Sequence, residues 1–429
     1  MTNQKYRVFF VILSKWIFWG TIVGLVIGTT TAFLLSTNDY LGEIREKNNW
    51  LVYFLPIGGL LIGYLYMNYG KKDGNNIAEG NNLIIDAVNG KARVLRRMGF
   101  LVYLGTFVTI IFGGSTGREG AAIQMGGSIS ETLNQFFKSH ILDKKILLMS
   151  GISAGFGAAF GTPISGAVFG MEMTSVGKIK FEAFVPCLVS SFVGHYVTVH
   201  AWGVEHKEKL FVKHIPDLSP ILFLKVIVLA IIFSLVAVLY CQLRHEIQKR
   251  SEKIFKENHM KRAFVGGLLV IALTWMVGTQ DYNGRSLPML EQAFTESVPP
   301  FAFLAKLIFT AVTLGMGFVG GEAIPLFFIG ATLGNALSEI FHLPLSFIAP
   351  LGMVAVFCGG ANTPIAAFLL AVELFDGKGV EYFFIACLIS YICSGHHGLW
   401  PSQTLYPPKS RLYSVVESET IKNIEKNKF

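Results

Sequence analysis

Long apolar stretches separated by short polar ones dominate the pattern of this chain. A helix needs about 18 apolar residues to cross a membrane. Stretches longer than this occur at residues 8–36, 146–172, 218–242 and 342–372. Further apolar segments lie at residues 50–69, 98–112, 182–204, 263–278, 299–316, 326–340 and 381–394. The pattern predicts an all-α polytopic membrane protein.

Composition and charge agree with this class. Hydrophobic residues make up 52% and charged residues 15% of the 429 positions, and the mean hydropathy is +0.51, which is too apolar for a soluble protein of this size. The first apolar stretch is too long and too glycine-rich for a signal peptide. The net charge of +8 comes from basic residues between apolar runs, where a topology signal explains it better than nucleic-acid binding.

The basic stretch 244–262 is interpreted as a cytoplasmic loop that divides the chain. It separates an N-terminal membrane half, 1–243, from a C-terminal membrane half, 263–405, and 406–429 is expected to be a short cytoplasmic tail. Both termini are expected in the cytoplasm, with the protein in the inner (plasma) membrane.

The two halves share an internal repeat. The sequence FGAAFGTPISGAVFGMEM (156–173) resembles FCGGANTPIAAFLLAVEL (357–374), and 114–127 matches 317–330. The second match places Glu119 opposite Glu322. Interrupted helices at corresponding positions of two halves point to the midplane binding site of a transporter.

The first interruption is GGSTGREGAAIQMGG, residues 113–127. A charge at the bilayer centre costs roughly 3 kcal/mol on insertion scales, so Arg118 and Glu119 mark a candidate ion or proton pathway. The glycines interrupt the helix, and the helix that restarts after Gly120 has an N-terminus suited to an anion. Glu119 is either a surrogate for that anion or a helix cap, and the repeat favours the first interpretation.

Together, GREG, the break GFVGGEAIP (317–325) and the two TPI segments resemble the CLC family of chloride channels and proton-coupled antiporters. The resemblance covers residues 80–400. It implies an inverted-repeat architecture with many broken and tilted helices, and a homodimer with one pore in each subunit. The apolar segments 182–204 and 381–394 are candidates for the dimer interface.

The resemblance is closest to the fluoride/proton antiporter branch. GNNLI (80–84) puts Asn81 where most relatives have serine, although GNNIA (74–78) is a rival alignment. Glu322 stands where this branch has a glutamate, and Met173 replaces the inner proton-transfer glutamate of the chloride antiporters. No nucleotide-sensing domain is expected after the membrane region. The family usually has a tyrosine in the pore near the C-terminus. That position is assigned to Trp400, or to Tyr406 under a shifted alignment.

This resemblance implies fluoride/proton antiport for fluoride export across the lipid bilayer. Glu119 is the expected gate and proton carrier, and Glu322 either handles protons, holds the pore open or caps its helix. The anion-binding residues expected are Asn81, Arg118, Gly120, Ala323, Ile324 and Trp400. A chloride/proton antiporter or a passive chloride channel of the same family is the alternative.

Other chemical motifs give weaker evidence of function. Arg118 is expected to be mainly structural, and Glu172 and Glu373 to be satisfied packing or interface residues. The adjacent His396 and His397 point in different directions, so no metal is expected, and no cofactor is expected either. GISAG (151–155) lacks the strand–turn–helix context of a hydrolase, which argues against an enzyme. The five cysteines lie in or beside apolar runs and are expected to be buried free thiols, not disulfides or metal ligands.

Overall fold

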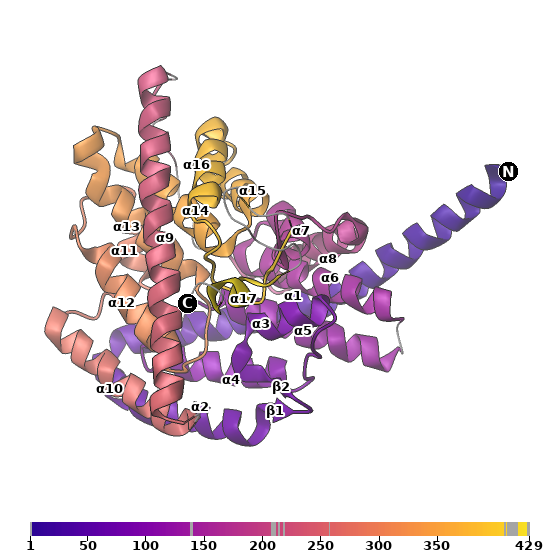
Figure 1. Cartoon of the computed structure of the whole chain (residues 1–429), viewed down its shortest axis with the longest axis horizontal. Coiled ribbons are helices and arrows are strands. Elements are labelled where there is room, and N and C mark those ends of the chain that lie inside the picture. Colours follow the sequence, from indigo (N-terminus) through magenta and orange to yellow (C-terminus); the bar gives the residue numbers. More distant parts are fainter. Residues whose placement is uncertain are drawn as a thin grey trace.

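The structure is a computed structural model. It describes residues 2–137, 140–206, 212, 215–217, 219–256, 258–406, 409 and 419–426. Helices account for nearly all of the regular structure (Figure 1), which confirms the all-α class. By length and composition, the helical segments able to cross a membrane are Tyr6–Lys47, Asn49–Tyr69, Phe181–Ala201, Pro220–Ile254, His259–Val277 and Ala323–Phe341.

The described part of the first half of the chain contains eight α-helices. They are α1 (Thr2–Lys47), α2 (Leu55–Tyr69), α3 (Asn81–Val88), α4 (Met98–Ile111), α5 (Glu119–Phe136), α6 (Ile141–Phe160), α7 (Pro163–Glu172) and α8 (Phe184–Tyr196). Short helical turns η1 (Asn49–Phe54), η2 (Ile77–Glu79), η3 (Phe181–Ala183) and η4 (Val197–Ala201) extend or connect them.

The second half repeats this order. Its helices are α9 (Pro220–Ile254), α10 (His259–Val277), α11 (Leu287–Gln292), α12 (Ala302–Gly315), α13 (Ala323–Phe341), α14 (Leu345–Ala361), α15 (Pro364–Leu374) and α16 (Val380–Cys393), with α17 (Ile421–Lys426) after them. Helices α4 to α8 correspond in order to α12 to α16, so the repeat seen in the sequence is a repeat of structure.

The strands are only two residues long each. Strands β1 (Lys71–Lys72) and β2 (Asn75–Asn76) form an antiparallel pair, and β3 (Ser175–Val176) pairs in parallel with β4 (Thr404–Leu405). The second pair fastens the segment after α16 to the segment after α7, and so holds Trp400 near the first half of the chain.

Two expected boundaries are wrong. The first helix does not stop at residue 36 but continues to Lys47, because Asp39 and Arg45 of its last turns have partners elsewhere in the fold. The basic stretch 244–262 is not a loop: α9 runs to Ile254 and α10 begins at His259. The polar residues of this stretch pack against α12 and the candidate ion pathway. They therefore extend α9 instead of ending it.

The two TPI segments are sites where helices break. Helix α6 ends at Gly161, which has φ +74°, and α7 restarts at Pro163. In the second half α14 ends at Asn362, with φ +58°, and α15 restarts at Pro364. A left-handed residue ends a helix, and proline is well suited to the first position of the next one. The apolar stretches 146–172 and 342–372 are therefore each two helices.

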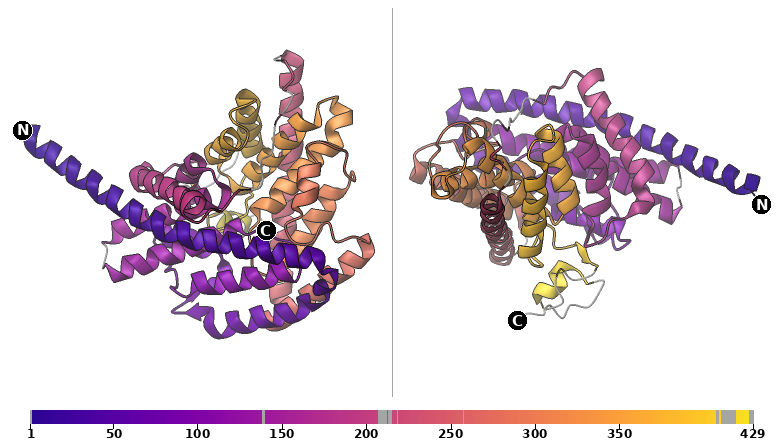
Figure 2. Two further views of the ribbon diagram at one scale, coloured as in Figure 1. Left: turned by 180° about the vertical axis from the view of Figure 1, so that it is seen from behind. Right: turned by 90° about the horizontal axis from the view of Figure 1, so that it is seen from above.

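Close helix packing follows the small-residue ridge of α1, whose N-terminal part projects beyond the other helices (Figure 2). The ridge of Gly20, Gly24 and Gly28 faces α8, and a Cβ atom added at Gly28 would lie 2.6 Å from the carbonyl oxygen of Gly194. Only glycine allows the two backbones to approach this closely.

An aromatic core joins the two halves beside the break regions. The rings of Phe156 and Phe169 stack at 4.1 Å, those of Phe327 and Phe357 meet edge to face at 5.2 Å, and Phe169 contacts Trp400 edge to face at 6.0 Å. Residues of both repeats thus form one rigid wall around Trp400.

Candidate ion pathway

The N-termini of α5 and α13 meet at the boundary between the halves. The amide N–H of Gly117 donates to the carbonyl oxygen of Gly321 at 2.8 Å, and the N–H of Gly321 donates to the oxygen of Gly117 at 2.7 Å. This antiparallel bridge brings two helix N-termini together, as the repeat predicted. The first N–H groups of a helix have no partner within the helix, so their donors and the positive ends of both dipoles converge here.

Glu119 is the first residue of α5, and its side chain is 3% exposed. Its Oε2 accepts a hydrogen bond from the backbone N–H of Arg118 at 3.0 Å, and its Oε1 lies 3.9 Å from Arg118 Nε. The carboxylate therefore folds back over the N-terminus of its own helix. In this position it accepts from the N–H of Arg118, one of the backbone donors beside the two helix N-termini.

Arg118 has structural contacts, as expected. Its Nη1 donates to Asp39 Oδ1 at 2.6 Å and to the carbonyl oxygen of Leu35 at 3.1 Å. Asp39 also binds Arg285 Nη2 at 2.8 Å. The guanidinium of Arg118 thus connects the break before α5 to α1, while the backbone N–H of the same residue faces Glu119.

Glu322 precedes α13 but makes no capping hydrogen bond to that helix. Instead its Oε1 accepts from the hydroxyl of Tyr240 at 3.2 Å and lies 3.3 Å from Arg244 Nε. The side chain is directed toward α9, so the structure does not support the capping interpretation. Ala323 and Ile324, which begin α13, are buried beside it.

A cavity of about 80 Å³ brings several predicted residues together. Asn81, Glu322 and Trp400 line it, along with Gln124 and Gly320. Within the described part of the chain, Trp400 Nε1 and Asn81 Oδ1 are buried without a hydrogen-bond partner. A buried polar atom without a partner is costly, which makes this cavity suitable for a polar ligand.

Glu119 does not line this cavity. The next residue, Gly120, packs against Gly321, and a Cβ added at Gly120 would lie 2.9 Å from the Cα of Gly321 and 3.5 Å from the carbonyl oxygen of Gly320, which is part of the cavity wall. Glu119 is therefore adjacent to the cavity across the glycine bridge.

Trp400, not Tyr406, occupies the cavity. Tyr406 lies beside Lys178, whose Nζ is 5.0 Å from its ring centroid, and its N–H donates to the carbonyl oxygen of Val176. The same geometry favours residues 80–84 over 74–78 for the alignment of Asn81, because Asn81 begins α3 at the cavity.

Several residues of the site were not found from the sequence. Tyr240 and Arg244 stand four positions apart on α9, which places them on one helix face, but Arg244 was assigned to a loop. The cavity also contains Arg262 and Glu79 near its polar end. Burial raises the pKa of the Glu79 carboxyl, and nearby Asp86 adds to this shift.

The loop between α10 and α11 braces the break before Glu119 from the other side. Asn283 Nδ2 and the N–H of Gly284 both donate to the carbonyl oxygen of Gly113, and the N–H of Thr116 donates to that of Gly284. The ammonium of Lys306, which is fully buried, donates to the carbonyl oxygen of Gly284 at 2.7 Å. This loop fixes the approach to the Gly117–Gly321 bridge.

Metal and thiol chemistry find no support among the described residues. No group of three or more His, Cys, Asp or Glu side chains in that part of the chain is arranged to hold a metal ion. All five cysteines are free, and Cys393 is exposed while the others are buried.

Comparison with known proteins agrees with this geometry. A family model described as voltage gated chloride channel matches residues 58–395. A chloride/fluoride channel protein of Pseudomonas syringae pv. tomato is 38% identical over 399 residues, which are 91% of this chain and 86% of that protein. An H(+)/Cl(−) exchange transporter of Cronobacter sakazakii is 25% identical over 64% of this chain and 61% of its own length.

Solved structures show the same fold. The crystal structure of a CLC-type fluoride/proton antiporter matches with a TM-score of 0.86 and 29% identity, and covers 92% of this chain and 98% of that one. A slow cyanobacterial Cl−/H+ antiporter matches with a TM-score of 0.73 and 20% identity, over 88% of this chain and 94% of that one. The chain therefore belongs to the voltage gated chloride channel (CLC) family of membrane transport proteins.

Proposed function

We propose that this protein is a fluoride/proton antiporter that exports fluoride, with Glu119 as its gate and proton carrier. The observation that carries the proposal is the position of the Glu119 carboxylate. It accepts from the N–H of Arg118 at the point where α5 and α13 meet. The similarity to a CLC-type fluoride/proton antiporter over nearly the whole chain supports the choice of ion.

The physical problem is the desolvation of a small anion. Moving a bare ion into a medium of low dielectric constant costs tens of kcal/mol by rough Born estimates, while one helix N-terminus contributes only about 0.3–2 kcal/mol. Convergent donors are needed, and the backbone N–H groups of Arg118, Gly120, Ala323 and Ile324 are the proposed set. The Trp400 indole N–H adds a side-chain donor in the cavity.

Asn81 completes the proposed anion site. The oxygen and nitrogen of a side-chain amide are nearly indistinguishable by shape. The reversed orientation of Asn81 directs its NH₂ group to the buried position that has no partner. An amide N–H in that place donates to an anion arriving in the cavity.

Proton coupling follows from competition for the same donors. Ionised, the Glu119 carboxylate replaces the anion at the helix N-termini. Protonated, it no longer needs those donors, so it leaves and the anion takes its place. One carboxyl group therefore alternates with the halide and carries a proton as it does so. Glu322, held by Tyr240 and Arg244, is the second proposed acidic group of the pathway.

Transport by purified protein in liposomes tests the proposal. Fluoride and chloride efflux are measured with and without a proton gradient, for the wild type and for Glu119→Gln. We expect fluoride efflux to drive uphill proton movement in the wild type only. Glutamine keeps the shape but cannot release a proton, so uphill proton pumping by Glu119→Gln contradicts the role of Glu119.

The alternative is a passive channel or a chloride/proton antiporter. One similar protein is named a chloride/fluoride channel protein, so the same experiment separates the classes. Rapid fluoride or chloride efflux without proton movement in the wild type identifies a channel, whereas chloride efflux that drives protons as well as fluoride does identifies a chloride antiporter.

We also propose a homodimer in the inner membrane with both termini in the cytoplasm. The surfaces of α8 and α16 carry exposed apolar side chains suited to a subunit interface, namely Phe184, Phe192, Phe384, Leu388 and Ile392. Cross-linking of cysteines placed on these helices tests the interface, and accessibility of terminal tags in intact cells tests the orientation.

A further inference from the structure

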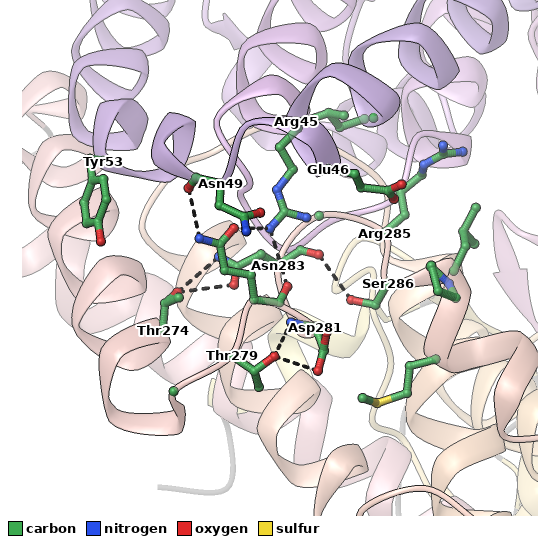
Figure 3. Close-up of a pocket in the computed structure, with 18 of the residues that line it drawn as sticks. Arg45, Glu46, Asn49, Tyr53, Thr274, Thr279, Asp281, Asn283, Arg285 and Ser286 are labelled. Atoms are coloured by element: carbon green, nitrogen blue, oxygen red, sulfur yellow. Dashed lines mark hydrogen bonds between the residues drawn. The ribbon is translucent and has the colours of Figure 1, made fainter. Parts of the chain in front are cut away.

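A second and larger cavity, of about 700 Å³, shares none of its lining residues with the first cavity and is drawn in Figure 3. Its walls are the C-terminal turns of α1, the turn η1, the end of α10 and the loop 278–289. This volume is within the range typical of small-molecule sites. The walls present both polar and apolar surface. The charged side chains therefore determine which class of ligand the cavity can bind.

Arg45 is the buried charge of this cavity. Its side chain is 9% exposed, and Nη2 donates to Gln280 Oε1 at 2.9 Å and to the Gln280 carbonyl oxygen at 3.4 Å. Within the described part of the chain, its Nε has no hydrogen-bond partner and no carboxylate lies within ion-pairing distance of the guanidinium. A buried charge without a counter-ion costs several kcal/mol, so Arg45 is a site for an anionic group.

Two carboxylates stand farther out in the same cavity. Glu46 and Asp281 line it and are exposed, and Asp281 Oδ2 accepts from the hydroxyl of Thr279. Both are close to Arg45 in Figure 3, although neither pairs with it. The other arginine of the wall, Arg285, pairs with Asp39, a carboxylate that it shares with Arg118. The cavity therefore presents a cation at depth and acids at its mouth, which matches a zwitterion.

The rim of the cavity belongs to the membrane-facing surface. Trp275 Nε1 donates to the hydroxyl of Tyr53 at 3.3 Å, and both side chains line the cavity while remaining exposed. Trp50, Phe54 and Met276 are exposed next to them. Tryptophan and tyrosine with apolar neighbours are typical of the level of lipid headgroups. A ligand that fits this rim is one whose acyl chains pack against the exposed aromatic and apolar side chains.

We propose that this cavity binds the headgroup of a phospholipid that carries a primary ammonium, such as phosphatidylethanolamine. Its phosphate pairs with Arg45 as a charge-assisted hydrogen bond acceptor. Its ammonium donates to Glu46 and Asp281, and its chains follow the surface of Tyr53 and Trp275.

Native mass spectrometry of the purified protein tests the site. The protein in detergent is incubated with phosphatidylethanolamine, phosphatidylcholine or phosphatidylglycerol of equal chain length, and bound lipid is counted. We expect phosphatidylethanolamine to be retained most, because the choline group has no N–H to donate and phosphatidylglycerol has no cation. Arg45→Gln lowers its retention about tenfold, as for the loss of one strong charge-assisted contact.

Matched controls keep the result specific. Arg250→Gln removes an exposed arginine from α9 and should leave retention unchanged. If Arg45→Gln does not fold, the double variant Glu46→Gln/Asp281→Asn carries the test, since both side chains are exposed. It should lose the preference for phosphatidylethanolamine over phosphatidylcholine.

Two outcomes overturn the proposal. One is equal retention by the wild type and the variant that folds. The other is binding of glycerophosphoethanolamine or inorganic phosphate as tight as that of the lipid, which assigns the site to a soluble phosphate compound. The readout is binding, so it is independent of whether the protein transports fluoride.

Discussion

Glu172 and Glu373 each cap a helix that belongs to the other half of the chain. The Glu172 carboxylate accepts from the N–H groups of Ile365 and Ala366 at 3.2 and 2.8 Å. The Glu373 carboxylate accepts from those of Ile164 and Ser165 at 2.9 and 2.7 Å. Such reciprocal contacts are what a two-fold relation between the halves requires.

Removing either cap should destabilise the fold more than it changes ion selectivity. Glu172→Ala leaves the N–H groups of Ile365 and Ala366, the second of them buried, without an acceptor at the start of α15, which costs about 2–4 kcal/mol. We expect a lower thermal unfolding temperature in detergent for Glu172→Ala and Glu373→Ala. The exposed Glu246 is the control position, and an unfolding temperature no lower than that of Glu246→Ala excludes a capping role.

Gly321 keeps the N-terminus of α5 accessible. A Cβ atom at this position would lie 2.7 Å from the backbone nitrogen of Gly120 and 3.1 Å from that of Glu119. Gly321→Ala should therefore cover the proposed donors and slow halide efflux from liposomes by at least about tenfold, or about 1.4 kcal/mol in activation free energy.

The matched control for this substitution is Gly360→Ala in α14. There the nearest heavy atom to an added Cβ is 3.4 Å away, an ordinary contact. Efflux should remain near the wild-type rate. Equal rates for the two variants would mean that the space at Gly321 does not limit transport.

The repeat made the centre of this fold predictable. The breaks at Glu119 and Glu322, and the Thr–Pro breaks before α7 and α15, are local signals of glycine, proline and charge. Each occurs twice, so the pairing of α5 with α13 followed without coordinates. The role of Glu172 as a packing residue was also expected, but its two N–H donors lie in the other half of the chain and were not identified.

The predictions that failed concern helix ends whose residues contact partners far away in the sequence. Polar residues 37–47 resemble the end of a helix, yet α1 continues through them because Asp39 pairs with Arg118 and Arg285. In the same way the basic residues of α9 resemble a loop, while Arg244 lies beside Glu322. A polar side chain near a membrane helix end has the same local pattern whether it faces water or a buried partner.

The hydroxyl of Tyr240 should set the activity of Glu322. Tyr240→Phe removes the 3.2 Å hydrogen bond to Glu322 Oε1 and keeps the ring in its fully buried place. A double-mutant cycle with Glu322→Gln, measured as fluoride efflux rates, should show a coupling of about 1 kcal/mol, or roughly fivefold in rate. Additive effects of the two substitutions would show that the hydrogen bond does not matter for transport.

The indole N–H of Trp400 is the proposed side-chain donor to the anion in the cavity. Nε1 is buried without a partner among the described residues, and the ring is 5% exposed against Phe169. Trp400→Phe keeps an aromatic side chain in the wall and removes only that donor and part of the ring. The apparent affinity for fluoride should fall about tenfold, the effect of one hydrogen bond to a charged group.

Trp202→Phe, at an exposed position after η4, should leave the affinity unchanged. An unaltered affinity in Trp400→Phe would mean that Trp400 only shapes the wall, so that backbone amides and Asn81 alone hold the anion.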